Sequence, residues 1–206
     1  MATDTQYAAV VTPSMIQRLA RISTEVAQPP LVLSLLLILA AVRDGGGITS
    51  LLPGLVAAVT ICLAPLLVVV ILARRGTLTD HHVGDKKQRR PVMLWTLASA
   101  LVGCGILTLI NTPVTVWALI TGILGGILAL IIVSPFWKVS GHAMTLGGAT
   151  VSSAMLFGVW SIPFVIAAPL VCWSRVYLKD HTLSQVITGF LTGLVVFGSA
   201  CVLILN

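Results

Sequence analysis

Two histidines, His142 and His181, lie in short polar segments of a chain whose remaining segments are mostly apolar. His142 ends the run Lys138–His142, and His181 follows Arg175 by six positions. A third polar run, Lys86–Pro91, is rich in cations. Guanidinium groups bind phosphate oxygens in pairs, and imidazole can attack phosphorus or transfer a proton. These residue types together predict a phosphate site with two proton-active side chains.

Phosphate chemistry at these segments requires several positive donors, because a phosphoryl group in transfer spreads negative charge over its oxygens. Arg90 and Arg175 are the best candidates for paired contacts with those oxygens. The backbone N–H groups of Ser140 and Gly141, where a helix is expected to start, would add donors, as would the Ser140 hydroxyl. One imidazole would then attack phosphorus while the other protonates the departing oxygen.

The composition indicates a membrane protein. The 206 residues are 57% hydrophobic and 9% charged, whereas a soluble domain carries about 25% charged residues. Long continuous apolar runs favour helices over barrel strands. We therefore expect a single all-α integral membrane domain over residues 1–206, with an interfacial segment at 1–28 and a bundle of six to seven transmembrane helices at 29–206. The expected partners are the bilayer and a substrate within it, and no nucleic acid.

Seven apolar segments define the expected helices: residues 29–42, 48–73, 92–111, 114–133, 143–159, 162–173 and 183–205. The fifth and sixth are shorter than the roughly 20 residues that a span needs. They are expected to form a tilted hairpin, or a pair partly buried by neighbours, with a turn at Ser161–Pro163. Ahead of the bundle, the apolar residues of Pro13–Val26 recur at helical spacing. This segment is interpreted as an amphipathic helix at the interface, with a polar tail as the alternative.

Positive charge is concentrated on one expected face of the membrane. The segments 74–91, 134–142 and 174–182 hold nine of the twelve Lys and Arg residues, and two expected spans separate each segment from the next. The positive-inside rule places such a face on the cytoplasmic side of the membrane. The membrane is expected to be the cell membrane. If these cations bind phosphate, their positions are poor evidence for which side of the membrane they face. That they share one face follows from the number of expected spans and does not depend on this rule.

The three polar runs resemble the signature blocks of the type 2 phosphatidic acid phosphatase (PAP2) superfamily, in the same order and over residues of about 80–190. Arg90-Pro91 resembles the end of the first block, Ser140-Gly141-His142 the second, and Ser174-Arg175 with His181 the third and closest. The superfamily includes lipid phosphate phosphatases, polyprenyl diphosphate phosphatases and vanadium haloperoxidases. The resemblance implies a PAP2/haloperoxidase-like helical core.

The resemblance also implies the roles of individual residues. His181 would be the nucleophile that forms a phosphohistidine, and His142 the general acid at the leaving group. The phosphate would be bound by four further residues: Arg90, Arg175, Ser140 and Gly141. The family uses no metal ion, so neither a metal nor another cofactor is expected. The pair His81-His82 is expected to be solvated rather than to bind a metal.

The chain departs from the family pattern in its first block and in its layout. Val83 occupies the position at which the family has a lysine, so Lys86 or Lys87 would have to supply the positive charge. The proline that precedes Ser-Gly-His in the family is Val139 here. Residues 92–133 separate the first block from the second and are long enough for two spans, which indicates a divergent membrane-bound branch.

A further departure concerns the residue that orients the nucleophile. Gln185, four residues after His181, occupies the position at which the family has an aspartate. On one helix face its amide oxygen can accept a hydrogen bond from the imidazole, but it supplies no negative charge. The supporting acid is expected to be Asp80 or Asp85, because Asp180 would point about 100° away from His181 on a helix.

These observations predict a metal-independent phosphatase that hydrolyses a lipid phosphate or polyprenyl (di)phosphate inside the membrane. A phosphotransferase with an alcohol acceptor is one alternative. A non-catalytic lipid-phosphate binder or transporter on the same scaffold is another, and Gln185 favours it.

Overall fold

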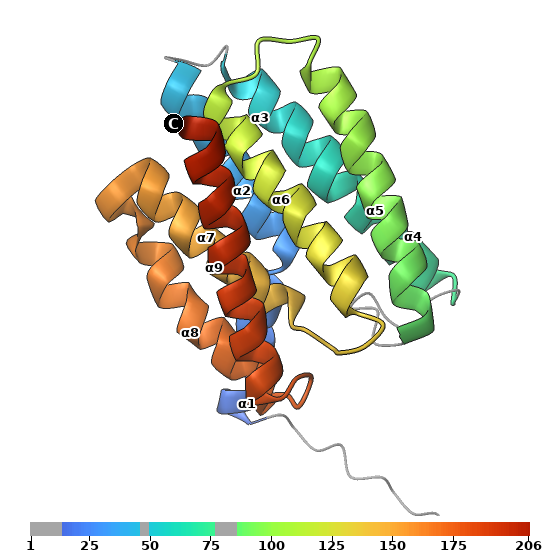
Figure 1. Ribbon diagram of the computed structural model, residues 1–206. Helices are drawn as coiled ribbons and strands as arrows, with labels where there is room; N and C mark the ends of the chain where they lie inside the picture. The colour runs from blue at the N-terminus through green and yellow to red at the C-terminus, as the bar shows by residue number, and fades with distance from the viewer. Residues whose placement is uncertain (1–13, 46–49, 77–85) are drawn as a thin grey trace, which may run out of the picture.

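The computed structural model describes residues 14–45, 50–76 and 86–206, with Gly45 and residues 86–90 described by their backbone alone. All regular elements in these ranges are helices, which confirms the all-α membrane fold class (Figure 1). They are α1 (Met15–Val26), α2 (Pro29–Gly45), α3 (Leu51–Ala57), the π-helix η2 (Ala58–Leu63), α4 (Ala64–Arg74), α5 (Lys86–Leu107), α6 (Val114–Val133), α7 (Gly141–Phe157), the 3₁₀ turn η3 (Gly158–Ser161), α8 (Ile162–Tyr177) and α9 (Leu183–Leu205).

Each predicted apolar segment contains a helix, but the number of spans is smaller than six to seven. In the described ranges, four helices are long and apolar enough to cross a membrane: Leu51–Arg74, Val114–Val133, Gly141–Tyr177 and Leu183–Leu205. The pair α1 and α2, bent by 49°, raises the number to five, and Pro91–Leu107 is a shorter apolar helix. The count is lower because the fifth and sixth predicted segments together make up one candidate, Gly141–Tyr177, in which α7 and α8, of 17 and 16 residues, are each too short for a full span. In addition, Pro91–Leu107 is too short, and α2 qualifies only together with α1.

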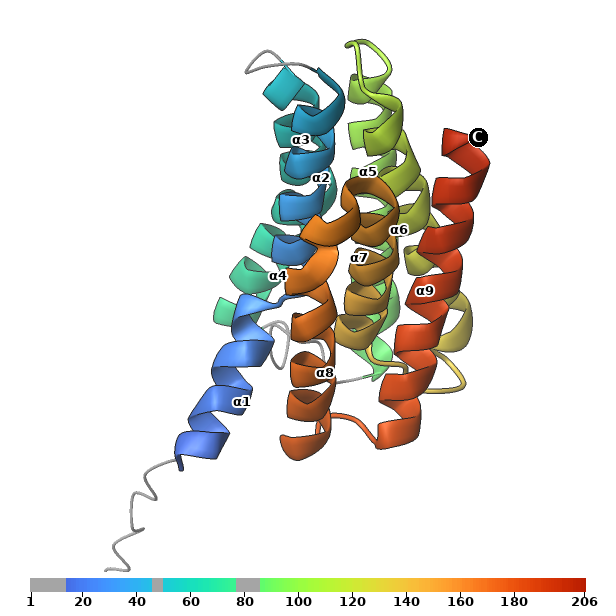
Figure 2. The ribbon, with the colours of Figure 1, turned by 90° about the vertical axis from the view of Figure 1, so that its left-hand side faces the viewer.

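Helices α7 and α8 form the predicted hairpin, and the chain reverses direction between them (Figure 2). The turn begins earlier than predicted, at Gly158, which has a φ of 56° at the end of α7. Glycine adopts this left-handed conformation without steric cost, which explains why the helix ends there. The hairpin returns the end of α8 to the level at which α7 began.

Helix α7 lies at the centre of the bundle and contacts α2, α6, α8 and α9. Its sequence is rich in Gly, Ala and Ser, and small residues allow backbones to approach closely. The closest approach is to α9, which carries the small residues Gly189 and Gly193 at a spacing of four. A Cβ on Gly193 would overlap the carbonyl oxygen of Met144, and a Cβ on Gly147 would overlap that of Phe190. The two helices therefore touch backbone to backbone.

Helix α1 is the amphipathic helix that the sequence indicates. Ser14 caps its first turn. Its buried residues Ala20, Ser23 and Thr24 lie on the side that packs against α8, whereas Met15 and Ile22 on the apolar side are exposed. Its location at a membrane interface remains a prediction.

The segments that carry the three polar blocks meet at one end of the bundle. Figure 1 shows the starts of α5, α7 and α9 and the end of α8 at its lower end. This common end agrees with the even number of crossings predicted between successive blocks.

The backbone contact between α7 and α9 leads to a stability prediction. Gly193→Ala should lower the melting temperature of the detergent-purified protein, because its methyl group must displace the Met144 carbonyl, and overpacking costs about 1–3 kcal/mol. The control is Gly105→Ala on α5, where an added Cβ meets no atom within 4 Å. Equal melting temperatures for the two variants would contradict the contact.

Candidate functional site

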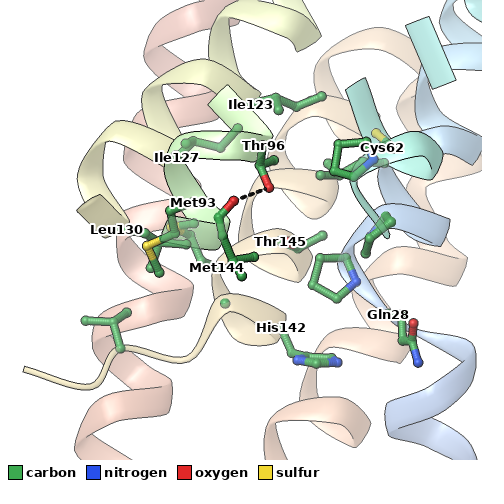
Figure 3. A pocket seen from close by; sticks show the side chains of 18 of the residues that line it. Gln28, Cys62, Met93, Thr96, Ile123, Ile127, Leu130, His142, Met144 and Thr145 are labelled. Atoms are coloured by element: carbon green, nitrogen blue, oxygen red, sulfur yellow. Dashed lines mark hydrogen bonds between the residues drawn. The ribbon is translucent and has the colours of Figure 1, made fainter. Parts of the chain in front are cut away.

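A cavity of about 420 Å³ lies between α2, α4, α5, α6 and α7 and reaches the end of the bundle where the polar blocks meet. Its charged and imidazole side chains are at that end, beside Gly141: Lys138, His142, Arg175, Asp180 and His181. Most of the remaining wall is apolar. Figure 3 shows His142 at one end of the cavity and Ile123 at the other. The two predicted catalytic histidines therefore line the same cavity.

His181 lies in the loop between α8 and α9 and is oriented by Gln185. Its Nδ1 lies 3.2 Å from Gln185 Oε1. The same oxygen accepts the backbone N–H of Thr182 at 3.2 Å, as part of a capping box at the start of α9. Because the Thr182 N–H can only donate, it fixes the amide oxygen of Gln185 toward the loop. His181 Nδ1 must then donate to that oxygen, which leaves the lone pair on Nε2.

The electrostatic surroundings keep His181 neutral. Its pKa is lowered to about 4, mainly by burial and then by the positive charges of Lys138 and Arg175. The hydrogen bond with Gln185 and the Asp180 carboxylate oppose this shift but are weaker. At neutral pH the imidazole therefore carries no proton on Nε2, the form that a nucleophile requires.

His142 is the second residue of α7 and is buried with an exposed fraction of 8%. Gly141, the first residue, lines the cavity, and a Cβ built on it meets no atom within 4 Å. The first N–H groups of a helix have no intrahelical acceptor, so the start of α7 presents an amide donor and a positive dipole end to the cavity. This arrangement favours an anion beside His142.

Ser140 is fully buried and caps α7, with its Oγ accepting the N–H of Ala143 at 3.4 Å. Its own N–H donates to the carbonyl oxygen of Gln185 at 3.3 Å, which joins the start of α7 to the start of α9. Neither Ser140 nor Gln185 is among the residues that line the cavity. A phosphate contact from Ser140 remains a prediction.

Arg175 lines the cavity near the end of α8, with an exposed fraction of 5%. One of its terminal nitrogens, Nη1, lies 2.9 Å from Asp180 Oδ2. Its Nε is buried and has no hydrogen-bond partner among the described residues. A buried donor without a partner costs about 1–3 kcal/mol. A phosphate oxygen would satisfy it.

Asp180 differs from its predicted placement. It lies in the loop after α8 rather than on a helix with His181, because the chain leaves the helix at Leu178 and Lys179 adopts a φ of 60°. Both Asp180 and His181 donate their backbone N–H groups to the carbonyl oxygen of Arg175. This tight turn brings the Asp180 carboxylate to the guanidinium of Arg175.

Lys138 is a site residue that the sequence reasoning did not select. It lines the cavity, and its Nζ donates to the backbone oxygen of Asp180 at 2.7 Å. Its position two residues before Ser140, within the second polar block, was the available signal. The ammonium group thus links the segment before α7 to the loop that carries His181.

Several predicted site residues lie outside what the structure describes. Asp80, Asp85 and the pair His81-His82 fall in undescribed residues, as do the side chains of Lys86, Lys87 and Arg90. The backbone of the last three belongs to the first turns of α5. Val92 and Met93, which directly follow Arg90-Pro91, line the cavity. The end of the first block therefore adjoins the cavity wall.

Helix α1 contacts the site from outside the cavity. Ser174 Oγ donates to the carbonyl oxygen of Val171, so the bond between Thr24 Oγ1 and Ser174 Oγ, at 2.9 Å, has Thr24 as its donor. Both hydroxyl groups are buried. This bond fixes α1 beside the residue that precedes Arg175.

In a comparison with protein families, residues 133–205 match the PAP2 superfamily. No curated protein matches the chain. No solved structure matches it. The matched residues contain the second and third polar blocks together with α7, α8 and α9. The resemblance to the PAP2 superfamily is therefore confirmed on residues 133–205, and the chain is consistent with a member of that superfamily.

Proposed function

We propose that this integral membrane protein is a phosphatase that hydrolyses a lipid phosphate or polyprenyl (di)phosphate through a phosphohistidine. The main supporting observation is the single cavity that both histidines line beside Arg175 and Lys138, with a mostly apolar wall beyond them. An amphiphile with an anionic headgroup and an apolar tail matches this distribution of polarity. The family match supports a phosphatase-type role in general.

In the first step, the Nε2 lone pair of His181 attacks phosphorus, and the bond from phosphorus to the lipid oxygen breaks. His142 donates a proton to that oxygen, so the lipid leaves as an alcohol. The Arg175 and Lys138 charges and the Gly141 amide balance the negative charge on the phosphoryl oxygens. The Nδ1–H of His181 stays bonded to Gln185 throughout.

In the second step, water attacks the phosphorus of the phosphohistidine while His142, now neutral, accepts a proton from the water. The bond from phosphorus to nitrogen breaks, and inorganic phosphate leaves. His181 returns to its neutral form and His142 to its protonated form. For a monophosphate, the cycle consumes one water and releases one alcohol and one phosphate. For a diphosphate attacked at its terminal phosphorus, the lipid monophosphate leaves in place of the alcohol.

Gln185 makes the first step harder than a carboxylate would, because phosphorylation gives the imidazole a positive charge that an amide does not neutralise. Asp180, which precedes His181 in the same loop, is paired with Arg175. This observation favours the second candidate, a non-catalytic lipid-phosphate binder or transporter. An enzyme, unlike a binder, should release more phosphate as the wild-type protein than as the His181→Ala variant. Product analysis with added alcohols distinguishes a hydrolase from a phosphotransferase.

We also propose that the site end of the bundle faces the cytoplasm at the cell membrane, because nine of the twelve Lys and Arg residues lie in the segments at that end. A membrane-impermeant thiol reagent applied to intact cells carrying Lys179→Cys tests this orientation.

The two histidines should respond differently to the leaving group. His181→Ala should abolish release from every substrate. His142→Ala should lower release from a lipid phosphate by about 10²–10⁴, the usual contribution of a general acid. It should have a much smaller effect on p-nitrophenyl phosphate, whose phenolate leaves without a proton. Both variants are tested by measuring phosphate release from each substrate with purified protein. The mechanism is wrong if His181→Ala and His142→Ala both retain hydrolysis of the lipid phosphate.

The low pKa of His181 predicts an unusual pH profile. A nucleophile with a pKa of about 4 remains deprotonated as the pH falls below neutrality, so kcat/KM should decline on the acid side only near pH 4. Gln185→Glu keeps the length of the side chain and the capping box but adds a carboxylate. It should raise the pKa of His181 and move the acid limb upward by about 1–3 pH units. If the acid limb of the pH profile is unchanged in Gln185→Glu, a group other than His181 controls that limb.

Lys138 should contribute to anion binding. Lys138→Met should raise the KM for substrate and the inhibition constant of vanadate by about tenfold or more, because a charged hydrogen bond is worth about 1.5–3 kcal/mol. Lys138→Arg should restore much of the loss. The matched control is Lys179→Met, which removes an exposed lysine of the adjacent loop that does not line the cavity. Equal effects of the two methionine variants would exclude a local role for Lys138.

A further inference from the structure

The cavity extends from the histidines into the middle of the bundle along one face of α6. Four residues of this helix and its C-cap line the cavity: Ile123, Gly126, Ile127, Leu130 and Ser134. At a rise of 1.5 Å per residue, Ile123 lies about 16 Å from Ser134 along the helix. The far part of the cavity is lined by Ile61, Cys62, Ile123 and Phe197, all of them apolar. A substrate tail that enters beside the histidines would end among these residues.

Phe197 is held in a slot made by glycines of α6 and α7. A Cβ on Gly122 would lie 2.7 Å from the Phe197 ring, and one on Gly148 would lie 2.5 Å from it. A Cβ on Gly126 would lie 3.6 Å from the ring edge. The exposed fraction of Phe197 is 2%. Because glycine backbone bounds the ring on its α6 and α7 sides, the ring has little room to move toward these helices for a longer tail.

The depth of this apolar region corresponds to about one leaflet, since the hydrocarbon core of a bilayer is about 30 Å thick. Resting on the proposed function, we propose that Phe197 determines specificity by limiting the length of the substrate tail. The substrate is then a phosphate or diphosphate with a single tail that ends within one leaflet, such as a short prenyl chain. A long polyprenyl tail would collide with the ring.

The test measures tail length with geranyl, farnesyl, geranylgeranyl and undecaprenyl monophosphates. For the wild-type protein, kcat/KM should rise with tail length up to a limit among the short prenyl chains and fall for undecaprenyl phosphate. Phe197→Ala should move the optimum by at least one prenyl unit toward longer tails and raise kcat/KM for the longer substrate about tenfold. Gly126→Ala, which adds a methyl group to the cavity wall, should move the optimum toward shorter tails.

Phe190→Ala is the matched control, because this phenylalanine lies two turns earlier on α9 and does not line the cavity. The optimal tail length of the Phe190→Ala variant should equal that of the wild-type protein. Phe197→Leu retains apolar volume in the slot and serves if the alanine variant does not fold. Identical tail-length profiles for wild type and folded Phe197 variants would overturn the proposal.

A second readout separates failure of this proposal from failure of the proposed function. Ligands that bind the folded protein raise its melting temperature whether or not they react. The same four monophosphates should therefore stabilise the wild-type and Phe197→Ala proteins with different tail-length optima. Without phosphate release, such a difference would still support the tail limit while rejecting the phosphatase. Phosphate release with equal optima would reject the tail limit alone.

Discussion

The candidate site depends on the backbone contact between α7 and α9. Glycines on both helices remove the side chains that would hold them apart, so Gly193 lies against the Met144 carbonyl and Gly147 against the Phe190 carbonyl. At the lower end of this contact the N–H of Ser140 donates to the carbonyl oxygen of Gln185. The start of α7, with His142, is thereby joined to the start of α9, whose first turn orients His181. Two histidines 39 positions apart in the chain share one cavity for this reason.

The electrostatics of the site differ from the family pattern in a consistent way. An amide stands where the family has a carboxylate, and two cations, Lys138 and Arg175, lie close enough to depress the pKa of His181. The loss of a negative neighbour and the presence of positive ones both favour the neutral imidazole. The same cations would attract a phosphate, whose charge would then replace the missing carboxylate as a partner for the phosphorylated ring. The bound substrate would thus supply part of the electrostatic balance of the site.

The bundle separates polar from apolar functions along its axis. Donors and proton-active groups are gathered at the ends of α7, α8 and α9, where helix termini present unsatisfied backbone groups. Above them the cavity runs between helices toward the glycine slot that holds Phe197. The π-helix η2 contributes to this wall through Ile61 and Cys62. An amphiphile can therefore place its headgroup and its tail in different environments of one cavity.

The sequence alone determined the helical segments, because their apolar runs are local and continuous, and of the two structures that satisfy the backbone in lipid, helices and closed barrels, only helices need such runs. It also predicted the polar blocks and their common end, since both follow from motif residues and from the number of crossings. Of the predicted site residues whose side chains are described, Gly141, His142, Arg175 and His181 line the cavity. The contribution of Lys138, the pairing of Asp180 with Arg175, the early turn at Gly158 and the position of Phe197 required the tertiary structure. Each of these depends on a loop conformation or on contacts between residues distant in the chain, which hydropathy and spacing do not encode.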